Sequence, residues 1–130
     1  MGHDLKHLTA CVVGVSGTGS IVVEQLARLG IGRLILVDFD EIEFKNLNRI
    51  INTTLEDART GIAKVARLAA AIRLYRDDIE ILTLKASIAT REAIELVGLA
   101  DVLFCCVDSF EGRQLCDRIA IMRHGKIVEV

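Results

Sequence analysis

Five segments whose residue types could do chemistry occur in order along this chain: a glycine-rich turn at residues 14–19, an acidic pair at 38 and 40, an Asn-Leu-Asn-Arg run at 46–49, a lysine at 64 and an aspartate at 108. A glycine turn before a helix binds phosphates through backbone N–H groups, and an acid that ends the next strand binds ribose hydroxyls. A dinucleotide needs no cations just after that acid, whereas a reacting triphosphate does. The order of these residues therefore predicts a site for ATP.

The glycine turn is the first candidate phosphate site, and it reads Gly14-Val15-Ser16-Gly17-Thr18-Gly19. It departs from the dinucleotide fingerprint, because a serine replaces the second glycine and an extra glycine follows it. Taken alone, the pattern also fits a tight strand-to-helix turn whose glycines serve packing. Asp38 follows the turn at the ~20-residue distance expected for a ribose-binding acid, which favours nucleotide binding. The role of Asp40 is less defined by this spacing.

The cationic candidates follow the acidic pair. Asn46 and Arg49 are three residues apart, so on a turn of helix both are expected to project the same way. The alternative for Arg49 is an exposed ion pair with Glu41 or Glu43. Lys64 is expected in the first turn of a helix, where the macrodipole disfavours a cation. A bound anion would explain a lysine at that place.

Asp108 is expected at the end of a strand that begins near residue 102. A carboxylate there can hold Mg²⁺, or it can cap the helix that follows. The neighbouring Cys105, Cys106 and Cys116 lie in apolar stretches, and we assign them to the core. The three histidines show no metal-ligand spacing and are expected on the surface.

The elements that position these residues alternate between strand and helix. Strands are expected over residues 10–15, 33–38, 79–84, 102–107 and 126–130, and helices over 17–29, 60–74 with Thr60 as cap, 90–97 and 109–125. This alternation predicts an α/β, Rossmann-like, doubly wound and mainly parallel sheet with helices on both faces. A reversal of strand order after the third strand would place strands one and four side by side. Residues 14, 38 and 108 would then meet at one crevice, at the carboxyl ends of the strands.

Composition limits the classes of protein to consider. The 130 residues make one domain, 52% of them are hydrophobic, and four Phe, one Tyr and no Trp indicate an aliphatic core. A net charge of −2 from 16 basic and 18 acidic residues argues against binding to nucleic acid or an anionic membrane. The apolar runs are shorter than the ~18 residues of a membrane span, and a signal peptide is not recognisable. Four cysteines without Cys-x-x-Cys spacing indicate a reducing cytoplasm.

Taken in order, the motifs resemble the adenylating domain of the ThiF/MoeB/HesA proteins, which is similar to ubiquitin-activating enzymes. That family carries a Gly-x-Gly-Gly-x-Gly turn, an Asp-x-Asp strand end, an Asn-Leu-x-Arg-Gln segment, a Gly-x-Pro-Lys helix start and a strand-end Asp. The resemblance covers nearly all of the chain. It implies an enzyme in which the C-terminal carboxylate of a small ubiquitin-like or sulfur-carrier protein attacks the α-phosphate of ATP, giving an acyl-adenylate and pyrophosphate.

The resemblance also implies a role for each matched residue. Gly14, Gly17 and Gly19 would cradle the nucleotide, Asp38 would bind the ribose, Asp40 would be a further nucleotide-binding residue, Asn46, Arg49 and Lys64 would face the phosphates, and Asp108 would bind Mg²⁺. Of these, Arg49, Lys64 and Asp108 would be closest to the chemistry. Because the substrate is its own nucleophile, alignment and charge neutralisation suffice and no base is needed. Members resemble homodimers in which an N-terminal arginine reaches the partner's site, and residues 3–7 contain no arginine.

Three departures from the family pattern stand out. Ser16 replaces a turn glycine, Ile50 stands where the family has Gln, and Ala63 stands where it has Pro. The first two are expected to weaken the site. The family's carrier-binding half would lie beyond residue 130, so we expect the sequence to be the N-terminal part of a longer enzyme, inactive by itself.

Two other functions fit parts of the pattern. An NAD-dependent Rossmann enzyme would use the glycine turn and Asp38, but Ser16 and the cations downstream argue against it. A non-catalytic member of the same family would keep the fold as a scaffold, and retention of every phosphate-facing residue argues against that. Dehydration of a modified tRNA base through an adenylate uses the same fold, and the absence of basic excess argues against nucleic acid as substrate.

Overall fold

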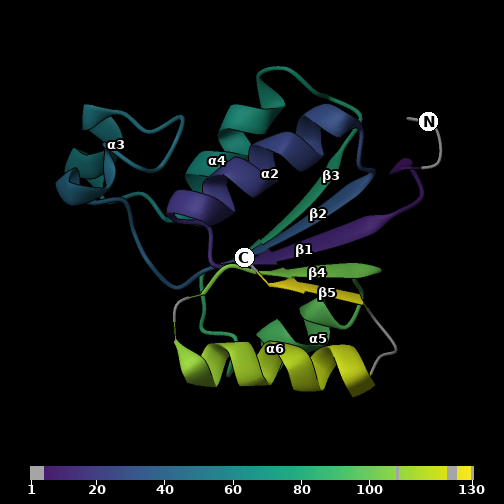
Figure 1. The fold of residues 1–130 in the computed structure, drawn as a ribbon. Helices are drawn as coiled ribbons and strands as arrows, with labels where there is room; N and C mark the ends of the chain where they lie inside the picture. The colour runs from purple at the N-terminus through teal and green to yellow at the C-terminus, as the bar shows by residue number, and fades with distance from the viewer. Residues whose placement is uncertain (1–4, 108, 123–125, 130) are drawn as a thin grey trace.

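A computed structural model describes residues 5–107, 109–122 and 126–129 and contains one parallel sheet (Figure 1). Its strands are β1 (Thr9–Val13), β2 (Arg33–Val37), β3 (Glu80–Leu84), β4 (Val102–Cys105) and β5 (Lys126–Glu129). They lie in the order β3-β2-β1-β4-β5, and every neighbouring pair is parallel. The predicted reversal after the third strand is confirmed, because β4 pairs with β1.

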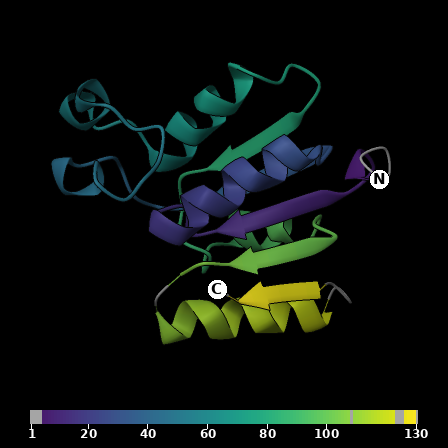
Figure 2. The ribbon, with the colours of Figure 1, turned by 45° about the horizontal axis from the view of Figure 1, so that its top comes forward.

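Helices cover both faces of the sheet, as Figures 1 and 2 show. One face carries α2 (Gly17–Leu29) and α4 (Lys64–Arg73), and the other carries α5 (Arg91–Val97) and α6 (Phe110–Met122). Residues 44–60 form a short segment beside the sheet, here called the excursion, which holds η1 (Phe44–Asn46) and α3 (Leu55–Thr60). The predicted α/β, doubly wound, Rossmann-like class is confirmed. The expected ends of the last helix and last strand, at residues 125 and 130, lie outside the described residues.

The two-residue period of the strands divides the core into two layers. In β1, Ala10 and Val12 pack with the helices α2 and α4, whereas Cys11 and Val13 pack with α5 and α6. Successive side chains of a strand point to opposite faces, so a strand covered on both faces must be apolar at every position. All five residues of β1 are buried, and four of them, Ala10 to Val13, are apolar.

The structure corrects the sequence prediction between residues 53 and 64. The helix expected over residues 60–74 is present as α4 and ends at Arg73, but it begins at Lys64, and its predicted cap, Thr60, is instead the last residue of a separate helix, α3. Thr54 caps α3 through a reciprocal pair of hydrogen bonds with Asp57. Gly61 then ends α3 at φ +66°, a left-handed conformation that breaks the helix. The predicted polar connection over residues 39–59 therefore contains two helical segments.

The excursion is tied to the two helices behind it. Arg67 of α4 donates from Nε to the carbonyl oxygen of Asn52 at 3.0 Å and forms an ion pair with the buried Asp57 at 3.5 Å. The Asn52 amide donates in turn to Glu24 of α2 at 3.1 Å. Because Ile50 is also buried, the excursion has both an apolar and a polar attachment to the sheet layer. This attachment holds the chain segment that carries Arg49.

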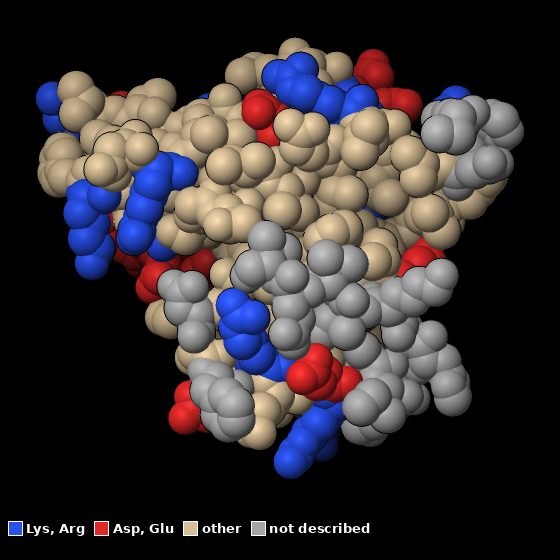
Figure 3. Space-filling view, in the orientation of Figure 1, with Lys and Arg blue, Asp and Glu red and all other residues tan. Residues whose placement is uncertain are grey.

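Among the described residues, none of the helices is long and apolar enough to cross a membrane. On the face drawn in Figure 3, the described Lys and Arg side chains lie in separate places among acidic ones, and one group lies at the end of the molecule that carries the excursion.

Candidate functional site

A cavity of about 500 Å³ opens at the carboxyl ends of β1, β2 and β4. Six of the nine predicted site residues line it: Gly14, Gly17, Asp38, Asp40, Arg49 and Lys64. These residues come from four separate segments, and the strand order brings them together as the topology predicted. A narrower, more apolar pocket of about 90 Å³ adjoins the cavity toward α5 and α6 and shares Gly14 and Asp38 with it.

The three glycines of the turn serve different purposes. Gly14 has φ +88°, and a Cβ there would lie 2.9 Å from the carbonyl carbon and oxygen of Cys106. A Cβ on Gly19 would lie 1.8 Å from the carbonyl oxygen of Gly14, so the first turn of α2 can approach β1 only without a side chain. A Cβ on Gly17 would meet only the Arg49 carbonyl oxygen, at 4.0 Å. Packing requires Gly14 and Gly19, whereas Gly17 leaves space in the cavity.

The N-terminus of α2 is open toward this cavity. Ser16 holds the N-cap position, but its side chain accepts no hydrogen bond from the helix's first turn, residues 17–20, all of which the structure describes. The first N–H groups of a helix lack intrahelical partners and carry partial positive charge. Gly17 and Thr18, which supply two of these N–H groups, both line the cavity. The arrangement suits an anion.

Asp38 organises the loops around the cavity. Its Oδ2 accepts a hydrogen bond from the backbone N–H of Val15 at 2.9 Å, and its Oδ1 accepts one from the N–H of Asp40 at 2.8 Å. The carboxylate thereby ties the glycine turn to the segment after β2. An ionised carboxylate has about four lone-pair sites, so Asp38 keeps acceptor capacity for a ligand hydroxyl.

Lys64 is the most buried charged group of the site. The residue is 4% exposed, lines the cavity and lies in the first turn of α4, as predicted. Its Nζ donates to Asp40 Oδ2 at 3.4 Å, and its backbone N–H donates to the Asp40 carbonyl oxygen at 3.0 Å. The dipole of α4 disfavours a cation at its N-terminus, and the carboxylate of Asp40, which pairs with the buried ammonium group of Lys64, is half exposed to solvent. A negatively charged ligand in the cavity would offset the unfavourable dipole and give the ammonium group a second anionic partner.

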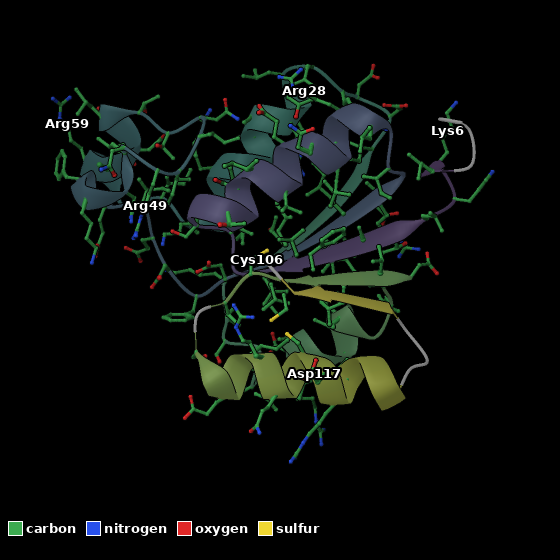
Figure 4. All side chains as sticks on the ribbon, in the orientation of Figure 1. Lys6, Arg28, Arg49, Arg59, Cys106 and Asp117 are labelled. Carbon is green, nitrogen blue, oxygen red and sulfur yellow. The ribbon has the colours of Figure 1, made fainter. Side chains whose placement is uncertain are left out.

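Arg49 is exposed and lines the cavity from the side of the excursion (Figure 4). The alternative ion pairs with Glu41 and Glu43 are wrong, because Glu41 pairs with Lys85 and Glu43 pairs with Lys45. Arg49 is thus available to a ligand. Its position follows from the attachment of the excursion, in which Ile50, the next residue, is buried.

Asn46 lies in a different environment from Arg49. It is 1% exposed and is not among the cavity-lining residues, so the expectation that both side chains project the same way is wrong. Its Oδ1 accepts from the backbone N–H of Glu43 at 2.9 Å, which closes the start of η1. Its Nδ2 is buried and has no hydrogen-bond partner among the described residues. A buried amide without a partner is costly, so this group is a spare donor.

Asp108 lies outside the described residues, so the structure gives no geometry for the predicted Mg²⁺ ligand. The hydroxyl of Ser109 accepts a hydrogen bond from the N–H of Gly112 at 3.1 Å and so caps α6. Within residues 5–107, 109–122 and 126–129, His, Cys, Asp and Glu side chains form no group of three that could hold a metal ion by itself.

Sequence reasoning missed several residues at the cavity. Ser16, Thr18 and Ser109 place side chains or backbone at its wall, and Phe39 lies at its rim. Cys106 also lines it; this residue is partly buried and packs against the core layer of α2 and α4, so its assignment to the core is confirmed in part, whereas Cys105 and Cys116 are buried as predicted. Burial raises the pKa of the Cys106 thiol to about 11. The available signal was position, since these residues adjoin the glycine turn or follow β2 and β4.

Comparison with known proteins extends this picture. The chain matches the ThiF family over residues 2–130. It is 33% identical over 123 residues to ubiquitin-like modifier-activating enzyme 5 of Culex quinquefasciatus, covering 85% of this chain and 30% of that protein. The enzyme of the same name from Aedes aegypti is 36% identical over 121 residues, covering 84% of this chain and 30% of its own length. The chain thus spans about 30% of the length of these curated relatives.

Solved structures share the fold. E. coli tRNA N6-threonylcarbamoyladenosine dehydratase, TcdA, in complex with AMP superposes with a TM-score of 0.88 at 24% identity, over 98% of this chain and 51% of that one. E. coli MccB with AMPCPP and MccA gives a TM-score of 0.87 at 23% identity, over 98% and 38% of the two chains. The match over residues 2–130 confirms the resemblance suggested by the motifs: the chain belongs to the ThiF family.

Proposed function

We propose that this chain forms the ATP-binding part of an enzyme that adenylates the C-terminal carboxylate of a small ubiquitin-like or sulfur-carrier protein and releases pyrophosphate. The chain is a ThiF family member and is similar to ubiquitin-like modifier-activating enzymes, of which it covers about 30%. TcdA has been solved with AMP and with ATP, and MccB with AMPCPP and MccA. These likenesses support an adenylating reaction and leave the identity of the carboxylate to experiment.

One observation carries the proposal: the buried Lys64, the exposed Arg49 and the uncapped N-terminus of α2 converge on one cavity. Each is a centre of positive charge from a different segment. A dinucleotide has two phosphates and no leaving group, so it does not need this much compensation. A reacting triphosphate does, because negative charge moves from the α-phosphorus onto pyrophosphate as the bond breaks.

The chemistry asks little more of the protein. A carboxylate oxygen of the carrier would form a bond to the α-phosphorus of ATP, the bond between that phosphorus and the bridging oxygen would break, and its electron pair would leave with pyrophosphate. No proton is transferred, so the protein supplies alignment and charge neutralisation only. In this proposal Arg49 and Lys64 contact phosphate oxygens, and Asp38 accepts from a ribose hydroxyl.

Mg²⁺ belongs to the same proposal. In nucleotide sites it is held by one or two carboxylates together with substrate phosphates. Asp40, half exposed at the cavity wall, fits that donor set, and Asp108 is the second candidate from the family motif. When bound, the ion would neutralise part of the triphosphate charge.

The assembly and cellular location are also proposed. The excursion exposes Phe44 by 60% and Leu55 by 57%, and a homodimer of the kind that the family motif implies would cover such apolar side chains. All four cysteines are free thiols, which suits a reducing cytoplasm. Sedimentation of the purified protein with and without a Phe44→Ser substitution tests the dimer.

The nucleotide is tested first, by the thermal shift of this chain with MgATP or with NAD. A ligand that binds the native state raises its stability by about 2.7 kcal/mol at a hundred times its Kd, so ATP is expected to raise the Tm and NAD is not. An increase with NAD in place of ATP would refute the proposal. A protein that responds to neither would be a scaffold member of the family.

The site residues are tested by pyrophosphate exchange in the complete protein. Arg49→Ala and Lys64→Met are expected to abolish exchange, because each removes a cation that faces the leaving group. Arg59→Ala is the matched control: Arg59 lies on the same excursion, pairs with Glu56 at 3.6 Å and is not among the residues lining the cavity. Exchange retained by Arg49→Ala or Lys64→Met would contradict the assignment.

A further inference from the structure

Ser16 stands where the family's glycine turn has a glycine, and the backbone there does not require one. Its φ is −80° and its ψ is −142°, outside the left-handed region that favours glycine. A left-handed backbone therefore does not exclude serine here. The expectation that this departure weakens the site stays a prediction.

The hydroxyl of Ser16 is not used to cap its own helix. Serine at an N-cap normally accepts a hydrogen bond from the second or third residue of the helix. Thr54 and Thr90 do so, accepting from the N–H of Asp57 at 3.2 Å and of Ala93 at 3.3 Å. Ser16 makes no such bond to the described first turn of α2. Its hydroxyl is left for another partner.

That partner lies on the cavity side. Ser16 is half buried and lines the cavity, next to Gly17, which contributes no side chain. The N–H on its other side, that of Val15, is already bonded to Asp38. The charges around the cavity, Lys64 and Arg49 together with the α2 N-terminus, favour an anionic ligand. A hydroxyl is a donor as well as an acceptor, so it can donate to a phosphate oxygen.

We propose that the Ser16 hydroxyl donates a hydrogen bond to a phosphate oxygen of the bound triphosphate, so that this chain adds a side-chain contact where the family turn offers backbone alone. The inference rests on the proposed function, because it takes the cavity to bind ATP. Ser16 is then a nucleotide-binding residue, and the replacement of glycine by serine at this position adds a contact with the ligand.

The test compares ligand affinities of Ser16→Ala, Ser16→Thr and Thr90→Ala with those of the unsubstituted chain, by calorimetry with MgATP and with magnesium tripolyphosphate. A hydrogen bond to a charged group is worth enough that its loss weakens binding about tenfold or more. Ser16→Ala is expected to weaken both ligands by that factor, and Ser16→Thr, which keeps the hydroxyl, to restore binding to within about threefold.

Thr90→Ala separates this role from ordinary helix capping. Thr90 caps α5 and is not among the residues that line the cavity. Its removal is expected to lower the Tm of the free protein and leave both affinities unchanged. Ser16→Ala is expected to do the reverse, because the hydroxyl makes no bond to α2.

Three results would overturn the inference. They are unchanged affinities in Ser16→Ala, a loss for ATP without a loss for tripolyphosphate, which would place the hydroxyl at the nucleoside, and a Tm of free Ser16→Ala lowered as far as that of Thr90→Ala. In each of these the unsubstituted chain still binds ATP, so the proposed function survives. A chain that binds neither ligand before substitution would refute the proposed function itself, and the inference with it.

Discussion

Two glycines of one helix, Gly17 and Gly19, are expected to respond in opposite ways to the same substitution. A Cβ on Gly19 would lie 1.8 Å from the Gly14 carbonyl oxygen, and real Cβ atoms do not approach another heavy atom within 3.0 Å. The start of α2 would have to retreat by more than an ångström, and Gly14 is itself held against Cys106. We therefore expect Gly19→Ala to be strongly destabilising.

The magnitude follows from overpacking. Forcing a methyl group into a close-packed contact costs about 1–3 kcal/mol and sometimes more, and the short distance to backbone places Gly19→Ala at about 3 kcal/mol or above. A domain of this size has about 5–15 kcal/mol of stability in total. The Tm is expected to fall by roughly 10 °C, at about 3–5 °C per kcal/mol for this chain length.

Gly17→Ala is the matched comparison. Its Cβ would meet only the Arg49 carbonyl oxygen, at 4.0 Å, and alanine is a better helix former than glycine by up to about 1 kcal/mol. The free protein is expected to be as stable as the original or slightly more so. The new methyl group occupies the cavity, so the stabilisation of the protein by MgATP is expected to shrink or disappear.

Thermal and urea unfolding of Gly17→Ala and Gly19→Ala, each with and without MgATP, measures the stability of each free variant and its stabilisation by the ligand. The reasoning is refuted if Gly19→Ala unfolds within about 2 °C of the original, or if Gly17→Ala loses as much stability as Gly19→Ala. It is also refuted for the site if Gly17→Ala keeps its full response to ATP. Far-UV circular dichroism of the native state excludes a trivial loss of folding.

Two further substitutions or modifications are predicted. Ala63→Pro is expected to raise the free energy of unfolding by about 0.4–1 kcal/mol. Ala63 already has φ −58°, and the hydrogen bonds of its bridge to Glu41 are donated by the N–H groups of Ile42 and Lys64, so proline removes no donor from that bridge. Urea unfolding measures the change, and a lower midpoint would contradict the prediction. Iodoacetamide is expected to label Cys106 slowly, with a rate rising about tenfold per pH unit up to its raised pKa of about 11, because only the thiolate reacts. MgATP is expected to protect Cys106, which mass spectrometry of the labelled peptide would detect; labelling that is unaffected by an ATP concentration that raises the Tm would count against occupancy of this cavity.

The fold was largely predictable because its signals are local. The continuous apolar runs of β1 and β2 require cover on both faces, and parallel strands joined by helices follow a few handed arrangements. The helix boundaries around Thr60 were not predictable in the same way. Residues 55–59 were expected in a polar connection and Thr60 as the cap of the next helix, whereas Gly61 ends α3 in a left-handed conformation and α4 begins at Lys64.

The candidate site was likewise predictable where the order of elements places a residue, and not where contacts between distant segments place it. Gly14 and Asp38 follow the ends of β1 and β2, and Lys64 begins α4, so their convergence comes from topology alone. Asn46 and Arg49 were expected to act together, but Asn46, the last residue of η1, is buried, whereas Arg49 is exposed on a segment that Arg67 of the distant helix α4 attaches. Such contacts join residues that are not neighbours in the sequence.

By itself, the sequence determined the order of strands and helices, the family, and the edge of the sheet at which polar residues meet, because each of these depends on periodicity and on residue types at element ends. Only the tertiary structure decided which glycine is needed for packing and which leaves space for a ligand. It also decided that Arg49 has no acidic partner among the described residues and that the Ser16 hydroxyl does not cap α2. Those outcomes depend on distances of a few ångströms between segments far apart in the chain, which a residue pattern does not encode.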